Sequence, residues 1–379
     1  MMRRPQRFEK ALLLRHHSNS LNFLRLALAL LVIFSHTIPI GGFGNEIIIG
    51  NLTLGDLSVD GFFAISGFLI CGSACRHTAR YGRARGLIKY FWDRVLRILP
   101  AFWMCLIMTA LFFGVVGWLH NHHGLAGYWS HAKGPFHYVV SNSYLRMNSY
   151  KISGTPSHVP YTLAWDGSLW TLSWEFLCYI GIAALSLFGL LARRTYVVAV
   201  AIAVWTLELY TFFNPSFFPN ENYALRFASI FLVGSLTYLY RDRLPDSGAL
   251  AALLALVACL GLTVGHPLSH VADLITGPAL VYPVLWLGAH LPFGKVGATN
   301  DLSYGVYIYA FPVGQLLALA NFERFGYLEF ALATIAGTLP LAAASWWGVE
   351  KWALRARSWL PFERLDNEVP RERIVSREN

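Results

Sequence analysis

The chain carries little charge for its size. Only 13% of its 379 residues are Asp, Glu, Lys or Arg, whereas 55% are hydrophobic, and an ordinary soluble domain has about 25% charged residues. So few charges cannot cover the surface of a water-soluble globule, and so apolar a chain is not intrinsically disordered. Five cysteines are too few for a secreted disulfide scaffold, and the sequence contains no internal repeat or low-complexity tract. The solvent of this chain is therefore largely lipid.

Long apolar runs take the place of charge. Mean hydropathy is +0.46, and 13 Trp, 18 Tyr and 26 Phe are available for the two membrane interfaces. A helix needs about 20 apolar residues to cross the hydrocarbon core. We therefore predict an all-α, polytopic integral membrane protein with about ten transmembrane helices, at residues 21–40, 57–75, 98–119, 173–191, 196–213, 224–240, 248–265, 271–290, 302–320 and 328–348.

The net charge of +9 raises the question of a polyanionic partner. Placed on the ten segments, however, 24 of the 30 Lys and Arg residues fall on one side of the membrane and four on the other. Because basic residues are retained in the cytoplasm during insertion, this asymmetry predicts cytoplasmic termini and argues against a nucleic-acid partner. We expect a basic cytoplasmic N-terminus (1–20), one membrane domain (21–350) and a cytoplasmic tail (351–379), in a multi-pass protein of the cytoplasmic membrane.

The long connection at 120–172 lacks the charge-rich composition of a solvated loop. We expect it to fold back onto the membrane surface or into a cavity, since irregular backbone at membrane depth is tolerated only where protein or water surrounds it. It holds a group of histidines whose spacing matches no metal-ligand pattern, and no cysteine accompanies them, so we expect no metal site. These histidines are His120, His122, His123, His131 and His137.

Two ionisable residues interrupt the first apolar run, Arg25 and His36. Eleven residues on a helix turn about 20° past three full turns and rise about 16 Å, so both side chains face the same way. A guanidinium near the cytoplasmic boundary suits phosphate recognition, and an imidazole deeper in the membrane suits proton transfer. The alternative is that Arg25 snorkels to the interface and His36 makes a hydrogen bond between helices.

A second pair of arginines, Arg94 and Arg97, precedes the third apolar run. Three residues apart on a helix, they lie on one face and can hold an anionic ligand at the cytoplasmic surface. They equally fit a role as two further charges that keep this loop in the cytoplasm.

Two carboxylates lie where His36 is expected, toward the outer ends of the second and fourth spans. Asp60 and Glu175 are each suited to accept the imidazole N–H and to raise its basicity, as the third group does in nucleophile–base–orienter sites. Each also fits an interfacial cap or an ion pair.

Taken together, these motifs resemble the bacterial membrane-bound acyltransferase 3 family. The family pattern is matched in order by residues 22–25 with His36, and by residues 62–70, 94–100, 168–175 and 302–312. The resemblance implies a membrane enzyme that adds acetyl or other acyl groups to sugar hydroxyls of surface polysaccharides, lipopolysaccharides or nodulation factors. It implies that His36 is the catalytic base and that Arg94 and Arg97 handle acyl-CoA on the cytoplasmic side.

Two departures from the family pattern stand out. Many members have a second histidine where this chain has Ala310, and many have a further basic residue where it has Asp93. We expect Arg25, Arg94 and Arg97 to hold the phosphates of acetyl-CoA, while the pantetheine arm reaches between helices to His36. Asp60 or Glu175 then orients the imidazole, and transfer is either direct or through an acyl-histidine.

The acceptor implied is a sugar or glycan, which the sequence leaves unidentified. Trp165, Trp170 and Trp174 either stack on a sugar ring or belong to the interfacial aromatic belt. Two other classes compete with the enzyme: a polytopic transporter or flippase, and a non-catalytic subunit that binds a lipid-linked glycan. Against a transporter, the chain shows no repeated halves and no paired interrupted helices.

Overall fold

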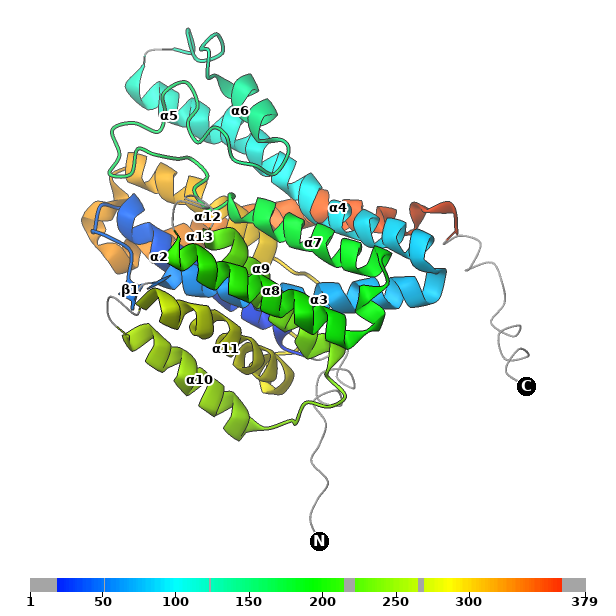
Figure 1. Cartoon of the computed structure of the whole chain (residues 1–379). Coiled ribbons are helices and arrows are strands. Elements are labelled where there is room, and N and C mark those ends of the chain that lie inside the picture. The colour runs from blue at the N-terminus through cyan, green and yellow to red at the C-terminus, as the bar shows by residue number, and fades with distance from the viewer. Residues whose placement is uncertain (1–18, 51, 123, 215–221, 265–268, 363–379) are drawn as a thin grey trace.

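A helical backbone follows from the composition, because a chain in hydrocarbon has to satisfy its backbone N–H and C=O groups within its own segment. The computed structural model describes residues 19–50, 52–122, 124–214, 222–264 and 269–362. Its long helices lie alongside one another as a single bundle (Figure 1). In chain order these helices are α2 (Leu21–Ile40), α3 (Leu54–Tyr81), α4 (Arg83–Met108), α7 (Thr171–Leu187), α8 (Arg194–Phe213), α9 (Asn222–Leu239), α10 (Gly248–Thr263), α11 (Ser269–His290), α12 (Ser303–Leu319) and α13 (Tyr327–Ser345).

Shorter elements complete the described chain. The π-helical turn η1 (Thr109–Phe113) continues α4 into α5 (Gly114–Asn121), and η4 (Trp346–Glu350) continues α13 into α14 (Lys351–Arg355). The other short helices are α6 (Pro135–Asn142), η2 (Leu190–Ala192), η3 (Phe322–Phe325) and η5 (Ala356–Trp359). Strands β1 (Ile48–Ile49) and β2 (Leu52–Thr53) pair antiparallel between α2 and α3.

Each of the ten predicted spans coincides with a helix, and the all-α prediction is confirmed. Within the described residues, six helical segments are long and apolar enough to cross a membrane. They contain α2, α3, α4 with α5, α8, α11, and α13 with its continuation. The segments at α7, α9, α10 and α12 are shorter, so ten crossings and the side of each terminus stay predictions. Helix α2 begins at one end of the bundle, the Arg25 end, and finishes at the other, the His36 end.

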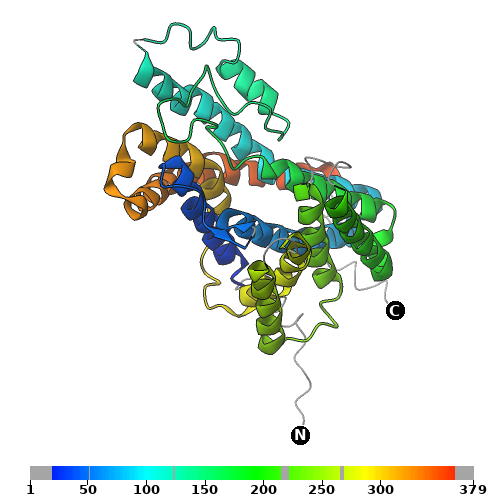
Figure 2. The ribbon, with the colours of Figure 1, turned by 60° about the vertical axis from the view of Figure 1, so that its left-hand side comes forward.

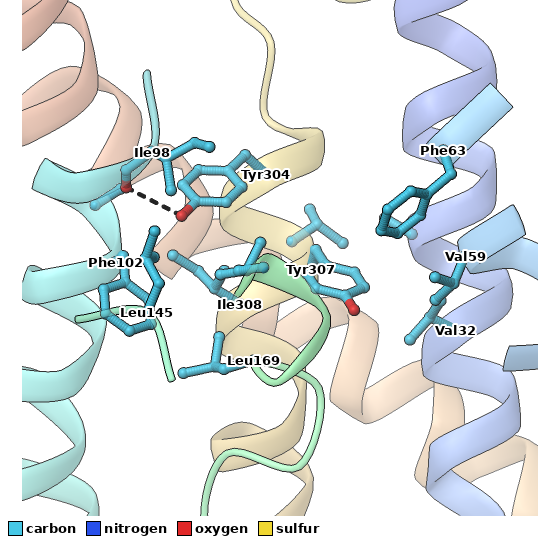
Figure 3. Close-up of a cluster of buried hydrophobic side chains, with 14 of the residues drawn as sticks. Val32, Val59, Phe63, Ile98, Phe102, Leu145, Leu169, Tyr304, Tyr307 and Ile308 are labelled. Atoms are coloured by element: carbon cyan, nitrogen blue, oxygen red, sulfur yellow. Dashed lines mark hydrogen bonds between the residues drawn. The ribbon is translucent and has the colours of Figure 1, made fainter. Parts of the chain in front are cut away.

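Helix α12 lies at the centre of the bundle. Fifteen of its 17 residues are buried, so it contacts protein on all sides, including α2 and α13. Figure 3 shows how its aromatic side chains diverge: Tyr304 donates a hydrogen bond to the carbonyl of Ile98 in α4 (3.0 Å), and Tyr307 points toward Val59 and Phe63 of α3. Helix α12 thus contacts α4 through Tyr304 and faces α3 through Tyr307.

Helices α3 and α9 pack backbone against backbone. A Cβ atom on Gly67 would overlap the backbone of Phe231, and one on Gly234 would overlap the carbonyl of Ala64. Small residues allow such close approach in membranes, where packing replaces the hydrophobic effect between helices. The glycine at position 67 is therefore needed for the contact between α3 and α9.

The segment from 122 to 170 folds back against the protein. Helices α5 and α6 extend beyond the bundle at one end, at the top of Figure 1 and Figure 2. The chain then returns, and the amide of Gln315 in α12 donates hydrogen bonds to the carbonyls of Tyr161 (2.8 Å) and Ala164 (2.7 Å). The continuous helix Arg83–Asn121 has 39 residues, or about 58 Å, which exceeds the roughly 30 Å of a bilayer core. Part of this helix therefore extends beyond the hydrocarbon core.

The start of the predicted C-terminal tail is attached to the bundle. The indole of Trp92 and the ammonium of Lys89, both in α4, donate to the backbone carbonyls of Ala356 (2.8 Å) and Arg357 (2.9 Å) in η5. Lys89 also pairs with Asp93 (2.7 Å). Residues 363–379 and the basic N-terminal residues 1–18 lie outside the described residues.

We predict a pH-dependent stability from Asp166 in the folded-back segment. Burial raises the pKa of Asp166 from 3.8 to about 7, against the opposing effect of the hydrogen bond from the hydroxyl of Tyr138. The unfolded chain therefore loses this proton at lower pH than the folded protein, so stability falls as pH rises from about 4 to about 7. Thermal unfolding in detergent should show this fall for the wild type and not for Asp166→Asn. Equal pH dependence of the two proteins would contradict the assignment to Asp166.

Candidate active site

The imidazole of His36 is paired with a carboxylate from the loop that follows its own helix. Nδ1 of His36 and Oε1 of Glu46 are 3.0 Å apart. Glu46 lies between α2 and β1, and it is the one acidic residue in the sequence between Arg25 and Asp56. When Nδ1–H donates to the carboxylate, Nε2 becomes the ring nitrogen that can take a proton.

The carboxylate of Glu46 is itself held in place. Its second oxygen accepts a hydrogen bond from the hydroxyl of Ser35, which in turn accepts one from the backbone N–H of Gly55 (3.0 Å) at the start of α3. Burial acts to raise the pKa of Glu46, but the hydrogen bond and charge of His36, with help from Ser35, outweigh it and lower the pKa. Glu46 is thus ionised at neutral pH, and it stabilises a protonated imidazole as the carboxylate of a catalytic triad does.

A cavity of about 260 Å³ borders the His36–Glu46 pair. The ring of Phe311 forms one wall, with its centre 5.5 Å from that of His36 and the two planes at 61°. The remaining lining mixes aromatic rings with hydroxyl and carboxylate groups: Pro39, Thr53, Gly55, Asp56, Val59, Tyr161, Gly167, Ser168, Trp170, Thr171, Tyr223 and Tyr307. We refer to it as the His36 cavity.

A second, narrower cavity of about 40 Å³ reaches Arg25. Its walls are largely apolar, with Glu175 and Ser303 among the exceptions. The other lining residues are Val59, Phe62, Phe63, Thr171, Leu172, Tyr304 and Tyr307. Because Val59, Thr171 and Tyr307 line both cavities, this Arg25 cavity and the His36 cavity adjoin. The two functional residues of α2 therefore each border one of two neighbouring spaces.

A network of ion pairs closes the Arg25 end of the bundle. Asp301, in the loop before α12, lies 2.9 Å from Arg25 and 2.5 Å from Arg97, and Arg97 also reaches Glu350 of η4 (3.2 Å). Burial acts to raise the pKa of Asp301, but the two guanidinium groups and the bonds from Ser303 lower it to about 2. Arg97 is thus held by two carboxylates, whereas Arg25 contacts one carboxylate through a single terminal nitrogen.

Arg94 differs from its neighbour Arg97. Its Nε atom is buried and has no hydrogen-bond partner among the residues that the structure describes. A guanidinium that retains unused donors is better suited to an anionic ligand than one that is already neutralised. Of the three arginines expected to hold phosphates, Arg94 has the most hydrogen-bonding capacity to spare.

The expectation that Asp60 or Glu175 orients the imidazole is corrected by the pair between His36 and Glu46. The fully buried carboxylate of Asp60 is paired with Arg226 of α9, and neither residue lines the His36 cavity. The carboxylate of Glu208 in α8 accepts a hydrogen bond from Ser229 of α9. The physical reason is that α3 and α9 are in close contact, which brings Asp60 to Arg226.

Glu175 has a different position from the one expected. Its carboxylate accepts hydrogen bonds from the hydroxyls of Ser66 (2.8 Å) and Tyr179 (2.6 Å), and it lines the Arg25 cavity. It therefore borders the path between Arg25 and His36 without contacting the imidazole.

The three tryptophans considered for sugar stacking have three different environments in the structure. Trp165 is completely buried, and its indole N–H donates to the hydroxyl of Thr155 (3.0 Å), so it neither faces a ligand nor belongs to an interfacial belt. Trp170 lines the His36 cavity and packs edge-on against Tyr223, with ring centres 5.0 Å apart. Trp174 lines an apolar groove between α7, α8 and α9.

Sequence reasoning missed Glu46, Asp301 and Tyr307. A signal existed for Glu46, because a lone carboxylate directly after the helix that carries His36 is close to the imidazole through the chain itself. Asp301 had a weaker signal as an acidic residue in a short loop. Tyr307 lies within the 302–312 motif, but nothing in the motif distinguishes it from the other tyrosines there.

Comparison with known proteins supplies the context for this geometry. Residues 18–347 match a family model described as an acyltransferase domain. The chain is 30% identical over 346 residues to the O-acetyl transferase of Shigella phage Sf6, and the match covers 89% of this chain and 96% of that protein. It is also 26% identical over 373 residues to nodulation protein 10 of Rhizobium leguminosarum bv. viciae, covering 92% of this chain and 96% of that protein. No solved structure matches the chain significantly.

We predict that the ion pair of Asp60 and Arg226 is structural. Asp60→Leu or Arg226→Met alone should remove most folded protein, because breaking a buried pair costs about 3–5 kcal/mol. The double variant should recover folding and activity, because replacing both charges leaves none of them unpaired. The measurements are the yield of monodisperse protein in detergent and its activity. A double variant that folds but is inactive would instead place one of these charges in the chemistry.

Proposed function

Because the chain belongs to the acyltransferase 3 family and is a multi-pass membrane O-acyltransferase, we propose that it transfers an acetyl group from acetyl-CoA to a sugar hydroxyl. The acceptor is a surface polysaccharide, a lipopolysaccharide or a lipid-linked glycan. The protein lies in the cytoplasmic membrane with its Arg25 end toward the cytoplasm. The excess of Lys and Arg on that side of the sequence supports this orientation.

One observation carries the proposal: α2 borders two adjoining cavities, one at Arg25 and one at His36. The substrates of the reaction are separated in the same way, since acetyl-CoA is a cytoplasmic polyanion and the glycan is displayed outside. We assign the narrow Arg25 cavity to the route of the long pantetheine arm, and the wider cavity with its aromatic walls to the sugar. The thioester and the hydroxyl then meet next to His36.

The imidazole of His36 acts as the general base. Its Nε2 takes the proton of the acceptor hydroxyl as the hydroxyl oxygen attacks the thioester carbonyl. The tetrahedral intermediate collapses, the C–S bond breaks, and the departing thiolate of CoA receives the proton from the imidazolium. Glu46 holds Nδ1–H and stabilises the positive charge while the ring is protonated. Exclusion of water from the Arg25 cavity protects the thioester against hydrolysis.

Arg94 and Arg25 bind the phosphates of CoA at the cytoplasmic end. Arg94 has donor capacity that the protein does not use, and Arg25 lines the narrow cavity while one of its nitrogens contacts Asp301. Arg97 has a structural role, because Asp301 and Glu350 already occupy both of its terminal nitrogens. The phosphate site expected on three arginines is therefore reduced to two.

We predict acceptor-dependent release of CoA. Purified protein given radiolabelled acetyl-CoA and lipid-linked glycans extracted from bacterial membranes should release CoA and label the glycan. His36→Ala should abolish labelling, and Glu46→Gln should lower kcat by about 100-fold, within the range for loss of acid–base catalysis. His290→Ala is the matched control, because His290 also pairs with a carboxylate (Asp246, 3.3 Å) but lines neither cavity. Movement of glycan across vesicles without release of CoA would indicate a flippase instead.

We predict different effects for Arg94 and Arg97 of α4. Arg94→Ala should raise KM for acetyl-CoA about tenfold, the loss expected for one charge-assisted hydrogen bond, without lowering the yield of folded protein. Arg97→Ala should lower that yield, because it leaves the carboxylate of Glu350 without its partner. Steady-state kinetics and size-exclusion profiles measure the two effects, with the exposed Arg243→Ala as a control on the same side. An unchanged KM in Arg94→Ala would contradict the phosphate contact.

A further inference from the structure

The boundary between the two cavities consists of Val59 in α3, Thr171 at the start of α7 and Tyr307 in α12. All three are buried. The hydroxyl of Tyr307 lies 2.6 Å from Oγ1 of Thr171, and it donates to the backbone carbonyl of Ser168 (2.9 Å). The tyrosine is thus tied to α7 on the line that joins Arg25 to His36. Its ring extends from α12 toward Val59, as Figure 3 shows.

In the structure the side chains at this boundary lie between two distinct cavities. The Arg25 cavity holds about 40 Å³ and the His36 cavity about 260 Å³. A thioester entering from the Arg25 side has to come within about 3.5 Å of its attacking oxygen for transfer to occur. The thioester therefore reaches the vicinity of His36 only when Tyr307 and Thr171 separate.

The same boundary is in contact with the place where an acceptor binds. Gly167, Ser168, Trp170 and Thr171 all line the His36 cavity, so a glycan in that cavity rests against the turn that begins α7. Gly167 lies against the ring of Phe311 so closely that a Cβ atom there would overlap it. Phe311 lies one turn along α12 from Tyr307. A ligand that displaces this turn therefore moves Thr171 directly and Tyr307 through Phe311.

We propose that Tyr307 and Thr171 form a gate that keeps the acetyl thioester apart from His36 and from outside water until the acceptor occupies the His36 cavity. The inference rests on the proposed function, because it assigns the two cavities to donor and acceptor. In the closed state the hydroxyl pair holds α12 against α7. Acceptor binding displaces the start of α7, opens the passage and admits the thioester. Hydrolysis, in which water attacks the carbonyl and releases acetate and CoA, is suppressed when no acceptor is present.

The test is the coupling of CoA release to acetyl transfer. Tyr307→Phe and Thr171→Val each remove one hydroxyl and keep the volume of the side chain, and loss of one buried hydrogen bond shifts an equilibrium by about tenfold. With acetyl-CoA alone in detergent, each variant should release CoA and acetate about ten times faster than the wild type. With extracted lipid-linked glycans added, each should release more than one CoA for every acetyl group transferred, whereas the wild type should release one.

The control is Tyr309→Phe, a buried tyrosine of the same helix that lines neither cavity, and it should keep the wild-type ratio. If both hydroxyl variants transfer more slowly without extra hydrolysis, the two residues only position substrate and the gate is overturned. If Tyr307→Phe fails to fold, Thr171→Val gives the same measurement in a side chain of matched shape. Wild-type protein that never acetylates a glycan would refute the proposed function instead, so the two failures are distinguishable.

Discussion

Charge inside hydrocarbon has to be neutralised within the protein, and this constraint orders the bundle. An isolated charge at the membrane centre costs at least a few kcal/mol, so the carboxylate of Asp60 faces Arg226, and Asp301 faces Arg25 and Arg97. The first pair joins α3 to α9, and the second group joins α2, α4 and the loop before α12. These contacts help to fix which face of α2 turns inward, and so where His36 lies.

The helices were predictable because their cause is local. A run of about 20 apolar residues forms a helix in lipid whatever surrounds it, and the ten runs identified in the sequence are all helical. The long helix that continues from α4 into α5 was harder to foresee, because its first half is rich in Arg and Lys and was assigned to a loop. Helical propensity of the basic residues and the contacts of Trp92 and Lys89 with the C-terminal segment stabilise it.

Only the part of the candidate site that lies on one helix was predictable from the sequence. Arg25 and His36 lie on one helix, so their spacing alone gives their relative direction. Their partners come from elsewhere: Glu46 from the loop before a two-residue strand, and Asp301 from the loop before α12. The pairing of carboxylates with cations depends on packing between helices. Sequence periodicity gives the faces of one helix, but it does not predict contacts between two helices. Asp60 and Glu175 were therefore reasonable candidates from the sequence. In the structure, packing pairs Asp60 with Arg226, and Glu175 with Ser66 and Tyr179.

The burial of α12 also bears on how the protein is made. A helix with 15 of 17 residues covered by protein, among them several tyrosines and Gln315, gains little from exposure to lipid alone and is accommodated beside helices already inserted. Its neighbours α2, α3 and α4 leave the ribosome long before it does. A nascent chain can therefore hold Arg25 and His36 in the membrane before Tyr307, which lines both cavities, is in place. The two cavities are completed only near the end of synthesis, so an unfinished chain lacks the site.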